Sequence, residues 1–246
     1  EIVAPFGDAP PQLLLGTLVR YVWGTHAEGS GLANGALLLS AEGDLLASME
    51  KHELVPGGET LPLIDWFSDE TAQVYREQVR AFAGYVPDLL RGPPPEPLQG
   101  PGGSFGVTIC YENAYGGLGR RLSRAGAGWL INLSNEGWFG RSVEFDHMEL
   151  QSVLRAVEAG RALYRSTNSG VSGLILPDGR APRGASRLER DGRDRDVRGV
   201  FLARVPLYER RTLYAQVGDG AGWLALALAI GLALLGRRGA SKGLFP

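Results

Sequence analysis

Two side chains in this sequence have the chemistry of a covalent catalyst, and the first is a lone cysteine. Cys110 is the only cysteine of the 246 residues and lies in TICYEN, near the end of a strand predicted over residues 105–111. A strand end that leads into a helix would place the thiol near unpaired backbone N–H groups, which stabilise a thiolate and can hold an oxyanion. This position favours a nucleophile, whereas a small buried apolar cysteine is the alternative.

The second candidate is a lysine in a chain that hardly uses lysine. Among 25 basic residues, only Lys51 and Lys242 are lysines. Arginine serves where a fixed positive charge suffices, so a retained lysine points to a compact ammonium whose pKa can move. Lys242 lies in the polar tail, whereas Lys51 opens KHELVPGGE, eight residues before Glu59. Lys51 is therefore the candidate catalytic lysine, and a solvated lysine at a strand end is the alternative.

The hydrophobic pattern predicts an α/β domain that would position these residues. Short apolar segments bounded by turn residues predict strands over residues 13–22, 36–39, 45–48, 105–111, 129–133 and 170–176. Apolar residues at helical spacing predict helices over residues 68–90, 114–125 and 144–163. Strands and helices alternate in the second half of the chain, which indicates α/β layering.

Composition argues against several other classes of protein. The formal net charge of −2 gives no electrostatic footprint for nucleic acid. A single cysteine excludes an internal disulfide, and His26, His52 and His147 form no metal-ligand spacing with it, so we expect no metal and no cofactor. The alternating arginines and acids of residues 187–198 indicate a solvated loop.

The segment 220–236, GAGWLALALAIGLALLG, contains no charged residue. Its composition predicts a membrane-spanning helix, with Trp223 as an interfacial anchor; a buried core helix is the alternative. Arg237, Arg238 and Lys242 follow it, so the positive-inside rule predicts a cytoplasmic tail and a folded domain on the other side of the membrane.

Four motifs, taken together, carry a resemblance to a known family. They are KHELVPGGE, TICYEN, NLSNEGWFG (132–140) and RAVEAGRALYRSTNSGVSGLI (155–175). Their order and context resemble the nitrilase superfamily and, more narrowly, the catalytic domain of the apolipoprotein N-acyltransferase family. The resemblance extends from about Leu13 to Asp219, and residues 220–236 lie where that family places its last membrane helix.

The resemblance implies a Glu-Lys-Cys triad. It assigns Cys110 as nucleophile, Lys51 as the catalytic lysine and Glu1, in the segment EIVAP, as the carboxylate. It also implies supporting residues at Glu59, Tyr111, Glu112 and Trp138.

The fold that the resemblance implies is a nitrilase-like αββα sandwich over residues 1–219, followed by one transmembrane helix at 220–236 and a basic cytoplasmic tail at 237–246. The implied activity moves a fatty acyl group from a phospholipid, through a cysteine thioester, to the N-terminal amine of a diacylglyceryl-cysteine lipoprotein. The implied partners are the phospholipid, the lipoprotein and the membrane, and the chain is expected to be a monomer. The implied location is the bacterial inner membrane, with the catalytic domain on the periplasmic side.

Two alternatives of other classes stay open. One is a soluble nitrilase-type amidase that hydrolyses a carbon–nitrogen bond, and the other is an inactive remnant that acts as a binding module. The family places several hydrophobic helices upstream of its catalytic domain. We therefore expect the 246 residues to be a fragment that transfers acyl groups slowly without them.

Overall fold

The structure is a computed structural model that describes residues 10–21, 31–140, 142–182, 187–209 and 211–240. The first three strands form an antiparallel sheet in the order β1-β2-β3. The strands are β1 (Leu13–Tyr21), β2 (Gly31–Leu39) and β3 (Leu45–Glu50). The strands predicted over 36–39 and 45–48 lie within β2 and β3, which pair antiparallel across the turn at residues 40–44. Lys51 is the first residue after β3.

The second sheet has five strands in the order β4-β5-β6-β7-β8. They are β4 (Leu98–Gly100), β5 (Gly103–Ile109), β6 (Trp129–Ser134), β7 (Ala162–Thr167) and β8 (Gly173–Ile175). The central strands β5, β6 and β7 are parallel, and the two edge strands are antiparallel to their neighbours. Parallel neighbours need crossover connections, so the carboxyl ends of β5, β6 and β7 meet at one edge of the sheet.

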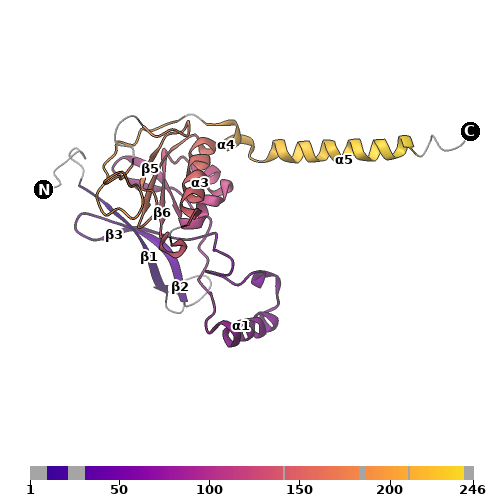
Figure 1. Cartoon of the computed structure of the whole chain (residues 1–246), viewed down its shortest axis with the longest axis horizontal. Coiled ribbons are helices and arrows are strands. Elements are labelled where there is room, and N and C mark those ends of the chain that lie inside the picture. The colour runs from indigo at the N-terminus through magenta and orange to yellow at the C-terminus, as the bar shows by residue number, and fades with distance from the viewer. Residues whose placement is uncertain (1–9, 22–30, 141, 183–186, 210, 241–246) are drawn as a thin grey trace, which may run out of the picture.

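Helices cover one face of the second sheet, and the first sheet covers the other (Figure 1). The crossovers are α2 (Gly116–Arg124) and α3 (Glu144–Ala159). Their apolar faces form a buried cluster with the sheet: Leu122, Ala127, Leu130, Ala156, Ala159, Leu163 and Ile175. A second cluster joins the two sheets: Ala36, Leu38, Met49, Phe105, Val107, Ile109 and Ile131. The expected α/β layering is confirmed. In the first sheet, the side chains of Leu13, Leu15 and Leu18 in β1 are exposed.

The segment that contains helix α1 lies away from the two sheets (Figure 1). After the 3-10 turn η1 (Ile64–Trp66), α1 (Asp69–Ala83) begins at the N-cap Ser68, whose hydroxyl accepts from the Thr71 N–H. The predicted helix over 68–90 is correct at its start and too long at its end, because Gly84 closes it with a φ of 79°.

The C-terminal part contains α4 (Leu213–Val217) and α5 (Gly220–Ala240), which points away from the sheets (Figure 1). Among the described residues, no helix has the length and apolar character that crossing a membrane requires. The membrane span predicted over 220–236 is not supported by this finding, although the segment is helical.

Candidate active site

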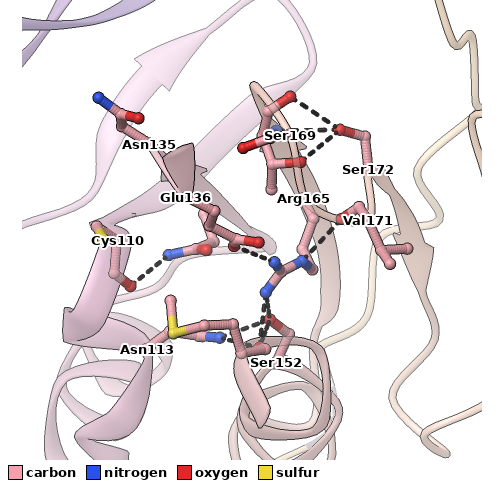
Figure 2. A network of polar contacts seen from close by, with 12 residues as sticks. Cys110, Asn113, Asn135, Glu136, Ser152, Arg165, Ser169, Val171 and Ser172 are labelled. Atoms are coloured by element: carbon pink, nitrogen blue, oxygen red, sulfur yellow. Dashed lines mark hydrogen bonds and ion pairs between the residues drawn. The ribbon is translucent and has the colours of Figure 1, made fainter. Parts of the chain in front are cut away.

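The candidate nucleophile lies on a strained turn at the end of a parallel strand. Cys110 follows β5 and opens the 3-10 helix η2 (Cys110–Ala114). Its φ of 53° is left-handed, a conformation that costs a non-glycine residue about 1–3 kcal/mol and persists where surrounding contacts enforce it. Asn132 on β6 supplies such contacts, since its Nδ2 donates to the Cys110 carbonyl oxygen at 3.3 Å and to Thr108 Oγ1 at 3.1 Å. This geometry presents a partly exposed thiol at the edge of the sheet (Figure 2).

A buried carboxylate joins the cysteine turn to the segment that follows Lys51. One oxygen of Glu112 accepts the Ile109 N–H at 2.8 Å. The other oxygen accepts the N–H groups of His52 at 2.7 Å and Glu53 at 3.1 Å. Because His52 directly follows Lys51 and Ile109 directly precedes Cys110, this one side chain brings the two candidate catalytic residues to the same place.

Opposing effects act on the pKa of the Glu112 carboxyl group. Its side chain is fully buried, and burial raises the pKa of the carboxyl group. The three backbone N–H donors and the positive charge of Lys51 oppose this rise in pKa, because they favour the ionised form. The interaction between the two charges is further evidence that Lys51 lies beside the cysteine turn.

Lys51 is fully buried and forms an ion pair with a second carboxylate. Its Nζ lies 2.7 Å from Oε2 of Glu59. Glu59 is itself fixed, because its two oxygens accept from the Val55 N–H at 2.9 Å and from Asn34 Nδ2 at 3.1 Å. The Lys51 N–H also donates to the Asn34 carbonyl oxygen at 2.7 Å, which ties the lysine to β2. The arrangement supplies a positioned ammonium in a site screened from water, where electrostatic stabilisation of an oxyanion is strong.

The loop after β6 lies at the same edge as Cys110. Ile109 pairs with Leu133 in the parallel β5–β6 register, so the segments that follow the two strands emerge side by side. Asn135 and Glu136 begin this loop, and Figure 2 shows both near the cysteine turn. The loop continues into the 3-10 turn η3 (Gly137–Phe139).

Comparison with known proteins places this site in a family. Residues 12–218 match the carbon-nitrogen hydrolase family. The chain belongs to that family. The match contains both Lys51 and Cys110, so the cluster described above lies within the family's domain.

The curated relatives include several apolipoprotein N-acyltransferases. The protein of that name from Bradyrhizobium diazoefficiens is 34% identical over 205 residues, which are 82% of this chain and 35% of the relative. The one from Geobacter metallireducens is 32% identical over 206 residues, 83% of this chain and 36% of the relative. The chain thus spans about a third of the length of the curated relatives it matches, and the resemblance noted from the motifs is confirmed.

Solved structures are similar to this chain at lower sequence identity. An amidase from Nesterenkonia sp. matches with 19% identity and a TM-score of 0.45, over 69% of this chain and 54% of that chain.

The carbon-nitrogen hydrolase domain brings four of the predicted residues together: Lys51, Glu59, Cys110 and Glu112. Their individual roles remain predictions. Tyr111 is half-buried beside them, with its ring edge-on to Tyr115 at a centroid distance of 5.8 Å. Trp138 lies on the neighbouring loop but its side chain is 85% exposed. Glu1, the predicted triad carboxylate, lies outside the described residues.

The sequence prediction missed one ion pair of this domain, between Glu136 after β6 and Arg165 in β7. Both side chains are buried, with exposed fractions of 0% and 1%. A carboxylate shortly after the strand predicted over 129–133 was a visible signal, but Arg165 lies in no strand predicted from the sequence. Their partnership could not be seen in the sequence, because it depends on the parallel pairing of β6 with β7.

A cavity of about 1070 Å³ lies behind the cysteine turn. Charged and polar side chains dominate its lining, among them His52, Glu53, Arg121 and Arg155, and neither Cys110 nor Lys51 contributes to it. Within the described residues, no group of three His, Cys, Asp or Glu side chains could hold a metal ion.

Proposed function

We propose that this carbon-nitrogen hydrolase domain is the catalytic part of an N-acyltransferase that carries a fatty acyl group on Cys110. The proposal rests on the hydrogen bonds of Glu112. They link the strained turn at Cys110 to the segment that directly follows the buried Lys51. The relatives named apolipoprotein N-acyltransferase supply the expected substrates, a phospholipid donor and a lipoprotein acceptor.

In the first half-reaction, the Cys110 sulfur attacks the ester carbonyl carbon of the phospholipid. A carboxylate takes the thiol proton, and we assign this role to Glu1 on the resemblance alone. Lys51 stabilises the negative oxygen of the tetrahedral intermediate, because its buried ammonium is already fixed by Glu59. When the intermediate collapses, the ester C–O bond breaks, the leaving lysophospholipid oxygen takes the proton, and a thioester remains on Cys110.

In the second half-reaction, the N-terminal amine of a diacylglyceryl-cysteine lipoprotein attacks the thioester carbonyl. The amine loses a proton to the same carboxylate, the C–S bond breaks and the Cys110 thiol regains its proton. An amide is formed and the enzyme returns to its starting state. Because both half-reactions use one cysteine, the kinetics are ping-pong.

The two substrates also define where the domain works. Both carry long acyl chains, so the proposed reaction takes place at a membrane surface, which we assign to the periplasmic side of the bacterial inner membrane. The exposed Trp138 beside the cysteine turn provides an apolar contact for an acyl chain that approaches Cys110.

The proposal is tested by trapping the thioester. Residues 1–246 are incubated in detergent micelles with a phospholipid that carries an isotope-labelled acyl chain, and the intact protein is weighed by mass spectrometry. We expect a labelled acyl group on Cys110 that hydroxylamine removes and that a diacylglyceryl-cysteine peptide accepts as an amide. Cys110→Ala is the control and should carry no adduct.

Three results would contradict the proposal. They are the absence of any adduct from phospholipid, a labelled adduct that persists in Cys110→Ala, and an adduct that only water can discharge. The last result would indicate a hydrolase, as in the amidase alternative.

A further inference from the structure

The buried pair Glu136–Arg165 is not used in the proposed chemistry, yet it lies at the centre of the polar network in Figure 2. Arg165 points inward from β7 and uses all parts of its guanidinium. Its Nε donates to the Val171 carbonyl oxygen at 3.0 Å, and its Nη1 donates to the Met148 carbonyl oxygen and to Ser152 Oγ, both at 2.6 Å. A planar fork with several donors suits such a task, and a lysine ammonium does not.

The network reaches the cysteine turn through two shared acceptors. Asn113, which lies in η2 with Cys110, donates through Nδ2 to the Met148 carbonyl oxygen at 3.2 Å and to Ser152 Oγ. These are the same two groups that Arg165 binds. Arg165 and the cysteine turn are therefore fixed to the same point of α3, and Ser152 is the junction between them.

The network also reaches the loop that carries Trp138. Glu136 binds Arg165 through its side chain, and its N–H donates to Asn168 Oδ1 at 2.9 Å. Asn168 in turn donates through Nδ2 to Asn135 Oδ1 at 2.7 Å. The loop after β6 is thus bound at three points, once by Arg165 of β7 and twice by Asn168, which follows β7.

The Glu136 carboxylate packs closely against Gly170. A Cβ built on Gly170 would lie 1.6 Å from Glu136 Oε2, so only glycine leaves room for the carboxylate. The carboxylate and the guanidinium therefore have fixed places.

We propose that Arg165, held by Glu136, is a positioning residue that sets the place of the Cys110 turn through Ser152 and Asn113 and the place of the Trp138 loop through Glu136. The inference deepens the proposed function and rests on Cys110 being its nucleophile. Charge supports it as well as geometry. Burial lowers the pKa of the Arg165 guanidinium, while the negative charges of Glu136 and of a Cys110 thiolate oppose that change.

The test measures the reactivity of Cys110 without any lipid. The rate constant for alkylation of Cys110 by iodoacetamide is measured against pH for Arg165→Lys and Ser152→Ala, together with thermal unfolding. We expect both variants to react about tenfold more slowly than the wild type, because small displacements of a reacting group have large effects on rate.

Two matched controls separate positioning from loss of stability. Arg161→Lys alters a buried arginine that directly precedes the first residue of β7. Its Nε donates to the Ala127 carbonyl oxygen. Ser123→Ala removes a buried hydroxyl that binds the Ala159 carbonyl oxygen. Both should keep the alkylation profile of the wild type, even where they lower the melting temperature as much as the test variants do.

Ser152→Ala leaves the buried Glu136–Arg165 ion pair intact, so it carries the test if Arg165→Lys does not fold. The inference is overturned if Ser152→Ala and any folded Arg165→Lys protein react like their controls at equal melting temperature. A failure of the proposed function looks different. In that case the alkylation rates follow the expectation, but no acyl adduct forms from phospholipid.

Discussion

At the scale of single residues, the ion pair of Lys51 and Glu59 allows stability and catalysis to be separated. Lys51→Met leaves the mostly buried Glu59 carboxylate without its partner, which should cost about 3–5 kcal/mol of unfolding free energy. Lys51→Met with Glu59→Gln removes both charges, and the glutamine oxygen can still accept from the Val55 N–H. Denaturant unfolding should show that the double variant regains most of the lost stability.

The same double variant should not regain activity. Lys51 is proposed to stabilise an oxyanion, so the rate of acyl-adduct formation should stay about 10²- to 10³-fold below the wild type. Stopped-time mass spectrometry measures this rate. Recovery of the adduct rate together with stability would show that Lys51 is only structural.

A second residue-scale prediction concerns the pH dependence of stability at Glu112. Burial raises the pKa of this carboxyl group above its ordinary value of 4.5, so the folded chain binds the proton more readily than the unfolded chain. The resulting contribution to stability is fully present below pH 4.5 and is lost as the pH rises through the higher folded value. In Glu112→Gln this contribution is absent.

The Glu112→Gln protein should be less stable by about 1–3 kcal/mol, because an amide cannot accept all three backbone N–H bonds. Its deficit relative to the wild type should be largest near pH 4.5 and should shrink as the pH rises. Urea unfolding between pH 4.5 and 8 measures the two free energies. Glu42→Gln, in an exposed turn, is the control and should show a constant difference; a deficit that grows with pH at Glu112 would contradict the prediction.

At the scale of elements, the position of Cys110 depends on how β5 packs against α2. A Cβ on Gly106 would lie 2.8 Å from Leu130 Cδ2 and 2.9 Å from Leu122 Cβ. Gly106→Ala should therefore push α2 away from β5, with a loss of about 1–3 kcal/mol in unfolding free energy and slower alkylation of Cys110. Gly102→Ala, where the added Cβ meets nothing within 4 Å, should change neither; equal effects at the two sites would refute this packing argument.

The elements also show where prediction from the sequence succeeds and where it fails. The predicted helix over 144–163 begins correctly, but α3 ends at Ala159 because Gly160 adopts a left-handed φ of 63°. The apolar residues 162 and 163 continue the helical spacing by coincidence, and they belong to β7, which the sequence analysis missed. The glycine was an available stop signal. Helix spacing alone could not distinguish a longer helix from a new strand.

The candidate site shows the same limit of prediction from local sequence. Cys110, Lys51 and their acidic neighbours could be found from residue type and local motifs. Arg165, Asn113 and Ser152 could not, because their shared hydrogen bonds join segments that are up to 52 residues apart in the chain. Only the folded arrangement of β7, η2 and α3 brings those donors to one acceptor.

At the scale of the whole molecule, α4 and α5 differ in how they join the α/β body. Ala215 of α4 is fully buried. The Gln216 carbonyl oxygen accepts from Arg120 Nη2 at 3.0 Å and from Arg124 Nη1 at 3.2 Å. In α5, by contrast, Leu224 and Leu232 are 62% and 70% exposed. The boundary predicted after residue 219 stays a prediction, which this change in packing favours.

The difference predicts how the chain responds to shortening. A protein that ends after Asp219 should keep its melting temperature within about 2 °C and its Cys110 alkylation rate, because α5 buries little apolar surface against the body. A protein that ends after Arg211 lacks α4 and its bonds to α2, so it should melt several degrees lower. Calorimetry and iodoacetamide labelling of the two shortened proteins measure both effects. If removal of residues 220–246 alone lowered stability as much as removal of α4, α5 would have to be part of the folded domain, and the boundary after residue 219 would be wrong.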